Sequence, residues 1–164
     1  MDYFAHGAWA YILFHKSKKV WWAVFFGMFP DTLSWLPYFF YRLFTQTEFG
    51  RPNFGAIPDW VFTLYGISHS ILICLLIISI TFFIFYKLKK NLPYYLLGWP
   101  LHILIDVPTH GKDFLPTPFL WPFSSYAFPG ISWSTPWFWI STWVAILICL
   151  GYIRWKKRKE KKEN

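Results

Sequence analysis

The feature that most limits how this chain can fold is a run of 27 residues, 60–86, without Asp, Glu, Lys or Arg. A helix of this length crosses the roughly 30 Å of hydrocarbon in a bilayer, because each residue adds 1.5 Å. Residues 20–41 and 131–153 have the same character, with Asp31 as their single charge. Three such runs predict a membrane protein.

Composition excludes the main alternatives. Of the 164 residues, 55% are hydrophobic, 25% aromatic and only 15% charged, against roughly 25% charged in an average soluble domain. A chain this apolar does not stay disordered in water. Cys74 and Cys149 both lie inside aliphatic runs, where a free thiol behaves as a small buried hydrophobe, so no disulfide scaffold is expected.

We therefore expect an all-α, multi-pass membrane bundle that forms one domain over 1–155. Two apolar segments, 3–14 and 93–107, are too short for ordinary spans, and Pro100 and Pro108 interrupt and end the second. Both should be partial or broken helices packed against the long ones. The expected long helices are 20–44, 60–86 and 137–155, the short or broken ones 3–15 and 93–108, with an outer cap at 111–136 and a basic tail at 156–164.

Charge placement orients the bundle. Lysines gather at 16–19 and 87–90, and residues 154–162 hold seven Lys or Arg, whereas the alternate connections carry few. The positive-inside rule places these three clusters, and the C-terminus, on the cytoplasmic side. Most of the formal charge of +8 thus belongs to membrane anchoring, and we do not expect nucleic-acid binding. Whether 3–14 spans the bilayer is left open.

Six ionisable side chains fall inside or just after apolar segments. An Asp in the middle of a membrane helix costs on the order of 2.5–3.5 kcal/mol, so such residues usually face a site or a partner. Counting along the helices brings Asp31, His69 and Asp106 to the middle or outer half of the bilayer, where His6 and His102 can join them from tilted or broken helices. The candidate metal ligands are His6, Asp31, His69, His102, Asp106 and His110.

The sharpest local motif is His102-Ile-Leu-Ile-Asp106, because a spacing of four places both side chains on one helical face. Neutral imidazoles with carboxylates are the ligand set of Zn²⁺, and also of Mn²⁺ or Fe²⁺. Asp31 and Asp106 neutralise one divalent ion, whereas two ions leave a positive site that suits hydroxide and an anionic phosphoester. Whichever carboxylate is less engaged with metal is the candidate catalytic base.

Purely structural roles for the same residues stay open. His102 and Asp106 can form a hydrogen-bonded pair with no further role, and Asp31 can bond a backbone group freed by Pro30. Adjacent residues on a helix point about 100° apart, so neither Ser68 nor Ser70 is expected to hydrogen-bond the neighbouring His as a nucleophile. Both serines are expected to bond between helices instead.

The chain resembles the family of bacterial membrane-bound, metal-dependent hydrolases, inner-membrane proteins that include a LexA-regulated member. That family is itself distantly similar to the superfamily of zinc-dependent phospholipases C and single-strand nucleases, helical enzymes that hydrolyse phosphoesters. The matching pieces are His6-Gly7, Phe29-Pro30-Asp31, Gly66-Ile67-Ser68-His69-Ser70, His102 to Asp106 with Thr109 and Gly111, and Leu120-Trp121-Pro122.

The resemblance implies that His6, Asp31, His69, His102 and Asp106 bind metal, with Asp106 a candidate bridge between two ions. It also implies the bacterial inner membrane and hydrolysis of a phosphoester or other ester of a lipid-like substrate. Many members carry a His where this chain has Leu64, and His110 is a candidate to replace it. Two other functions stay open: a metal or proton carrier, and a structural membrane protein whose His and Asp pairs staple short helices.

Overall fold

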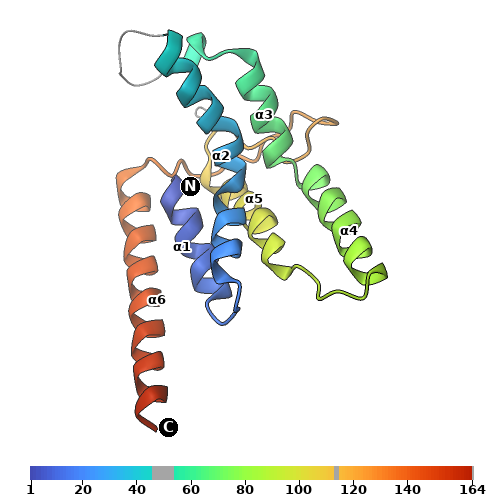
Figure 1. The fold of residues 1–164 in the computed structure, drawn as a ribbon. Coiled ribbons are helices and arrows are strands. Elements are labelled where there is room, and N and C mark those ends of the chain that lie inside the picture. Colours follow the sequence, from blue (N-terminus) through green and yellow to red (C-terminus); the bar gives the residue numbers. More distant parts are fainter. Residues whose placement is uncertain (46–53, 113–114, 164) are drawn as a thin grey trace.

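The computed structural model describes residues 1–45, 54–112 and 115–163, and the secondary structure in these ranges is helical, with no strand (Figure 1). The expected all-α fold class is confirmed. The described helices are α1 (Tyr3–Phe14), α2 (Val20–Thr45), α3 (Asp59–His69), α4 (Ile71–Lys87), α5 (Gly98–Thr109) and α6 (Pro136–Glu163), with short 3-10 helices η1 (Phe54–Ala56) and η2 (Tyr94–Leu97).

The longest uncharged run does not form one helix. It divides at Ser70 into α3 and α4, which bend by 55° relative to each other. Ser70 has an extended backbone, and its hydroxyl accepts a hydrogen bond from the Ile73 N–H as the N-cap of α4. The break is further stabilised from outside, because the Ile71 N–H donates to the Phe119 carbonyl. Hydropathy alone carries no signal of such a break, and the expected single helix over 60–86 is wrong.

The expectation of three long membrane spans is also wrong. Among the described helices, α6 is long and apolar enough to cross a membrane, and the bent pair of α3 and α4 qualifies only if counted as one span. Helices α1 and α5 have 12 residues each, which is about 18 Å. Helix α2 has 26 residues, but Pro30, Asp31, Ser34 and Pro37 lower its hydropathy. Helix α6 also continues through the expected tail to Glu163.

The site is positioned by the tight packing of α2 between α1 and α5. A Cβ on Gly27 would lie 2.7 Å from the Cβ of Ala10 in α1, and a Cβ on Gly98 would lie 2.3 Å from the carbonyl oxygen of Ala23 in α2. Side chains at these positions would keep the helices apart, so glycine permits both close approaches. A core of Cys74, Ile78, Trp99 and Ile103 then packs α4 against α5.

Most of the expected cap 111–136 is irregular chain in its described residues, 111–112 and 115–135, and Pro136 already begins α6. The chain is held at two places. The Ile131 and Trp133 N–H groups donate to the Pro108 and Thr109 carbonyls at the end of α5. At the break between α3 and α4, the Ser70 hydroxyl donates to the Trp121 carbonyl at 2.6 Å. The cap is therefore anchored to both helices that contribute histidines to the candidate site.

Much apolar surface remains exposed on this fold. The accessible surface is 10953 Å², whereas a compact soluble protein of 19.7 kDa exposes about 8,600 Å². Helices α4 and α6 stand away from the centre (Figure 1), and large apolar side chains on them and on α2 are exposed. Surfaces of this kind normally contact a partner or lipid.

Candidate metal centre

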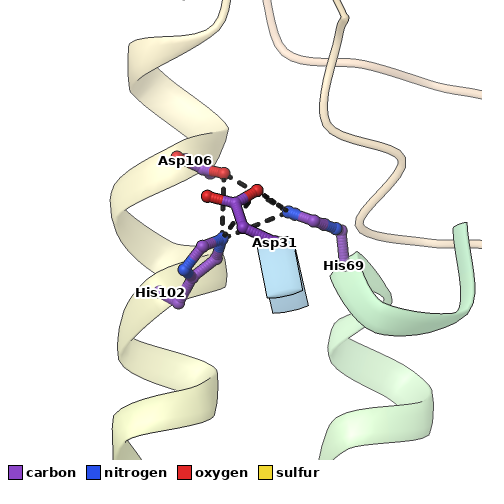
Figure 2. A group of neighbouring side chains, drawn as sticks. All are labelled: Asp31, His69, His102 and Asp106. Carbon is purple, nitrogen blue, oxygen red and sulfur yellow. Dashed lines mark hydrogen bonds and ion pairs between the residues drawn. The ribbon is translucent and has the colours of Figure 1, made fainter. Parts of the chain in front are cut away.

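Four side chains from three helices converge beneath the cap. Asp31 comes from α2, His69 is the last residue of α3, and His102 and Asp106 lie one turn apart on α5 (Figure 2). Each offers one ligand atom, and these four atoms all lie within 4.8 Å of one another. The predicted placement of His102 and Asp106 on one helical face is confirmed, with 3.2 Å between His102 Nε2 and Asp106 Oδ2.

The hydrogen bonds of the two imidazoles fix which nitrogen faces the centre. His102 Nδ1 lies 2.7 Å from the Gly27 carbonyl oxygen, and His69 Nδ1 lies 3.0 Å from the Tyr65 carbonyl oxygen. A carbonyl oxygen only accepts, so each Nδ1 carries a proton, and in a neutral imidazole Nε2 then keeps its lone pair. The two Nε2 atoms face each other at 3.1 Å. When both imidazoles are neutral, neither Nε2 has a proton to donate to the other.

The spacing of the four acceptors suits a tetrahedral cation. Ligand atoms about 2.0–2.1 Å from a tetrahedral zinc ion lie roughly 3.3 Å from one another. Around the centre, His69 Nε2 lies 3.5 Å from Asp106 Oδ2 and 3.6 Å from Asp31 Oδ1, and His102 Nε2 lies 4.0 Å from Asp31 Oδ1. Asp31, His69, His102 and Asp106 could therefore bind a metal ion.

Burial distinguishes the two carboxylates. Asp106 is 1% exposed, and its Oδ2 has no hydrogen-bond partner among the described residues. The Asp31 side chain is 13% exposed and lines a cavity of about 610 Å³. The other three members of the group do not line that cavity, so the centre is accessible from the Asp31 side.

His6 lies on the Oδ1 side of Asp106, whereas His69 and His102 contact Oδ2. His6 Nε2 is 2.9 Å from Asp106 Oδ1, and its ring stacks on His102 with 3.6 Å between centroids. The other ring nitrogen, Nδ1, is buried without a hydrogen-bond partner among the described residues. The amino group of Met1 also contacts Asp106 Oδ1 and the Thr109 hydroxyl. The structure thus brings His6 to the site, and its role as a ligand stays a prediction.

His110 also adjoins this side of Asp106. Its Nδ1 is 3.5 Å from Asp106 Oδ1, but the same nitrogen lies 3.2 Å from the Asp106 carbonyl oxygen and 3.3 Å from the Thr117 hydroxyl. Burial lowers the pKa of His110 to about 4, so the imidazole is neutral at physiological pH. Because Nδ1 is engaged with a carbonyl, only Nε2 is free to bind a metal, and the expected ligand role stays a prediction.

Ser68 contacts its neighbour His69, but not as a nucleophile would. The Ser68 hydroxyl lies 2.9 Å from His69 Nδ1, because both side chains reach back to the Tyr65 carbonyl over the last turn of α3. Since Nδ1 carries a proton, it cannot accept one from the hydroxyl. Ser68 also bonds the Ser34 hydroxyl at 3.0 Å and so connects α3 with α2, as expected of an interhelical serine. Ser68 is fully buried, which leaves it no access to a substrate.

Two contributors to the site were missed from the sequence. The backbone carbonyl of Gly27 orients His102, and no side-chain pattern reports a backbone partner. The ring of Tyr65 packs against His69 at 3.9 Å between centroids and donates its hydroxyl to the Leu115 carbonyl in the cap. The spacing of Tyr65 and His69, one turn apart, was the available signal for this second contact.

Comparison with known proteins adds no assignment: no family model, no curated protein and no solved structure matches this chain. The functional argument therefore depends on the geometry of the site.

Proposed function

We propose that the protein is an integral-membrane, metal-dependent hydrolase that acts on a phosphoester or other ester of a lipid-like substrate. The observation that carries the proposal is the convergence of four lone-pair atoms, two imidazole Nε2 atoms and two carboxylate oxygens, with both imidazole protons engaged elsewhere. Four acceptors at such distances repel one another unless a cation lies among them. We propose zinc, with manganese or iron as the other candidates.

The arrangement of the basic segments supports a multi-pass membrane protein of the bacterial inner membrane. The turn between α1 and α2, the connection between α4 and α5, and the C-terminal end of α6 lie at the same end of the molecule (Figure 1). These segments hold the basic clusters 16–19, 87–90 and 154–162. A bilayer that begins at that end agrees with the positive-inside rule and covers exposed apolar side chains on α2, α4 and α6. The relation to the bacterial hydrolase family is part of this proposal.

The two carboxylates have different roles in the proposed reaction. A bound divalent ion would lower the pKa of water toward 7 and polarise the ester. Asp106 is fully buried and would hold the ion together with His69 and His102, which leaves the fourth tetrahedral position for water. Asp31 faces the cavity and is the better placed general base. The oxygen of water forms the new bond to phosphorus or carbonyl carbon, the bond to the alcohol breaks, and the proton taken by Asp31 passes to the leaving alkoxide.

Metal analysis of detergent-purified protein tests the proposal. Wild-type protein should contain close to one zinc or manganese ion per chain, and His102→Ala and Asp106→Asn should lose both the metal and the hydrolysis of lipid phosphoesters. Matched controls are His15→Ala, whose ring lies in the turn after α1, and Asp59→Asn, an exposed carboxylate at the start of α3. Circular dichroism would establish that all four variants keep their helices.

The alternatives give different results in these experiments. Full activity in metal-free protein would overturn the proposal. Ion flux into reconstituted vesicles that Asp31→Asn abolishes would favour a carrier. A lowered melting temperature in the site variants, with no hydrolysis by wild-type protein of any ester tested, would leave only a structural role for the cluster.

A further inference from the structure

The cavity beside Asp31 has a second feature that the metal cluster does not use. Its volume is about 610 Å³, within the usual range for ligand sites, and it begins at Asp31 and His110. From there one wall follows α2 through Trp35, Leu36 and Phe39. Asp31, Trp35 and Phe39 are spaced by four residues, so they lie on one face of the helix along about 12 Å.

The charge and exposure of this cavity select one kind of occupant. No Lys or Arg is among the described residues that line it, and the Met1 amino group, which belongs to a lining residue, is already bonded to Asp106 and Thr109. Asp2 adds a carboxylate to the lining, so a polyanion such as a nucleotide finds no free cationic group among these residues. Leu36 and Phe39 are about half exposed, at 47% and 51%, so the mouth of the cavity is apolar. The wall continues into the apolar outer surface of α2, where Phe40 and Phe44 are exposed.

We infer that this cavity binds the alkyl chain of an amphiphilic phosphoester, with the head group at Asp31 and the chain along Trp35, Leu36 and Phe39. The inference deepens the proposed function and depends on it for the identity of the head group. An amphiphile fits both ends of the cavity, because its polar head reaches the acceptor cluster while its chain leaves through an apolar mouth toward lipid. Leu36 and Phe39 then determine chain-length preference and take no part in the chemistry.

Binding of alkylphosphonates, which resemble the substrate but are not hydrolysed, tests the inference separately from catalysis. Butylphosphonate and octylphosphonate are compared by equilibrium dialysis against zinc-loaded protein held in amphipol. Each buried methylene strengthens binding by about fourfold, so four added methylenes raise affinity by up to about 250-fold. We expect octylphosphonate to bind at least 30-fold more tightly than butylphosphonate to wild-type protein.

The double variant Leu36→Ala with Phe39→Ala should reduce this ratio to less than tenfold with unchanged zinc content. Phe44→Ala is the matched control, because Phe44 is 86% exposed on the same helix and does not line the cavity. Equal affinities for both phosphonates, an unchanged ratio in the double variant, or no binding of either would overturn the inference.

Hydrolysis measured on the same protein separates the two proposals. Chain-length-dependent binding without hydrolysis of any ester would refute the enzyme and keep the alkyl-chain site. Metal-dependent hydrolysis that is equally fast for short and long alkyl phosphoesters would keep the enzyme and refute the alkyl-chain site.

Discussion

The crossing of α2 and α5 sets the distance between Asp31 on α2 and the pair His102 and Asp106 on α5. A substitution at Gly98 can change that distance. A Cβ at this position would lie 2.3 Å from the Ala23 carbonyl oxygen and 2.8 Å from the Gly27 backbone nitrogen. Both are backbone atoms, so no side chain can rotate away. The two helices must separate by about 1 Å before the contact becomes an ordinary van der Waals distance.

Gly98→Ala is therefore expected to weaken both the fold and the site. Overpacking of this kind costs about 1–3 kcal/mol, which for a chain of this size lowers the melting temperature by roughly 3–10 °C. His102 lies one turn after Gly98, and metal sites tolerate displacements of only about 0.2 Å. A movement of about 1 Å takes His102 and Asp106 away from Asp31 and His69, and metal affinity should fall by at least about tenfold.

The matched control is Gly151→Ala, because a Cβ at Gly151 in α6 meets no atom within 4 Å. This substitution should be neutral, or should raise stability by up to about 1 kcal/mol, since alanine is the better helix former. Metal affinity is measured by competition with a zinc chelator dye, and unfolding by differential scanning fluorimetry. Wild-type metal affinity and melting temperature in Gly98→Ala would refute the claim that this crossing positions the site.

Three further predictions concern the anchors of the fold and the ion. Ser70→Ala removes the N-cap of α4 and leaves the Trp121 carbonyl without its donor. It should destabilise the fold by about 1–2 kcal/mol in thermal melts, whereas the control Ser79→Ala, on the exposed surface of α4, should not. Trp143→Phe removes the 3.0 Å hydrogen bond to Asp2 that joins α6 to the start of α1, and should cost about 1 kcal/mol, with exposed Trp137→Phe as the neutral control. Chelation should lower the melting temperature of wild-type protein, and zinc at 100 times its Kd should restore about 2.7 kcal/mol; the same treatment should leave His102→Ala unchanged.

The sequence was informative wherever spacing along one helix determined the outcome. The i to i+4 relation of His102 and Asp106 predicted their shared face, and the interruption of apolar runs by Asp31 and His69 identified them as site candidates. Burying a carboxylate or imidazole among apolar residues is costly without a partner, so their presence alone carried information.

What the sequence could not supply depends on contacts between distant segments. The break at Ser70 is stabilised by Phe119 and Trp121 in the cap, nearly 50 residues further along the chain. The orientation of His102 depends on the backbone carbonyl of Gly27, which any residue would provide, and the approach that allows it depends on small residues at the crossing. Counting charged residues alone also overestimated the number of membrane-spanning helices. It ignored the uncharged polar and proline residues near Asp31 that lower the hydropathy of α2.

The choice between a metal centre and a simple His–Asp staple can be argued from the number of acceptors. If His69 or His102 is protonated at Nε2, the added N–H donates a hydrogen bond to one acceptor only. The remaining lone pairs of the cluster then still face one another in a buried space. A divalent ion among these atoms attracts all of their lone pairs at once and neutralises both carboxylates, also when Asp31 lies beside a bound water instead of binding the ion directly. A staple between two helices needs one His–Asp pair, whereas α2, α3 and α5 together supply two of each, and the most exposed of them faces a cavity. The surplus of ligands over what a staple requires is the physical reason to favour a metal ion that reaches a substrate.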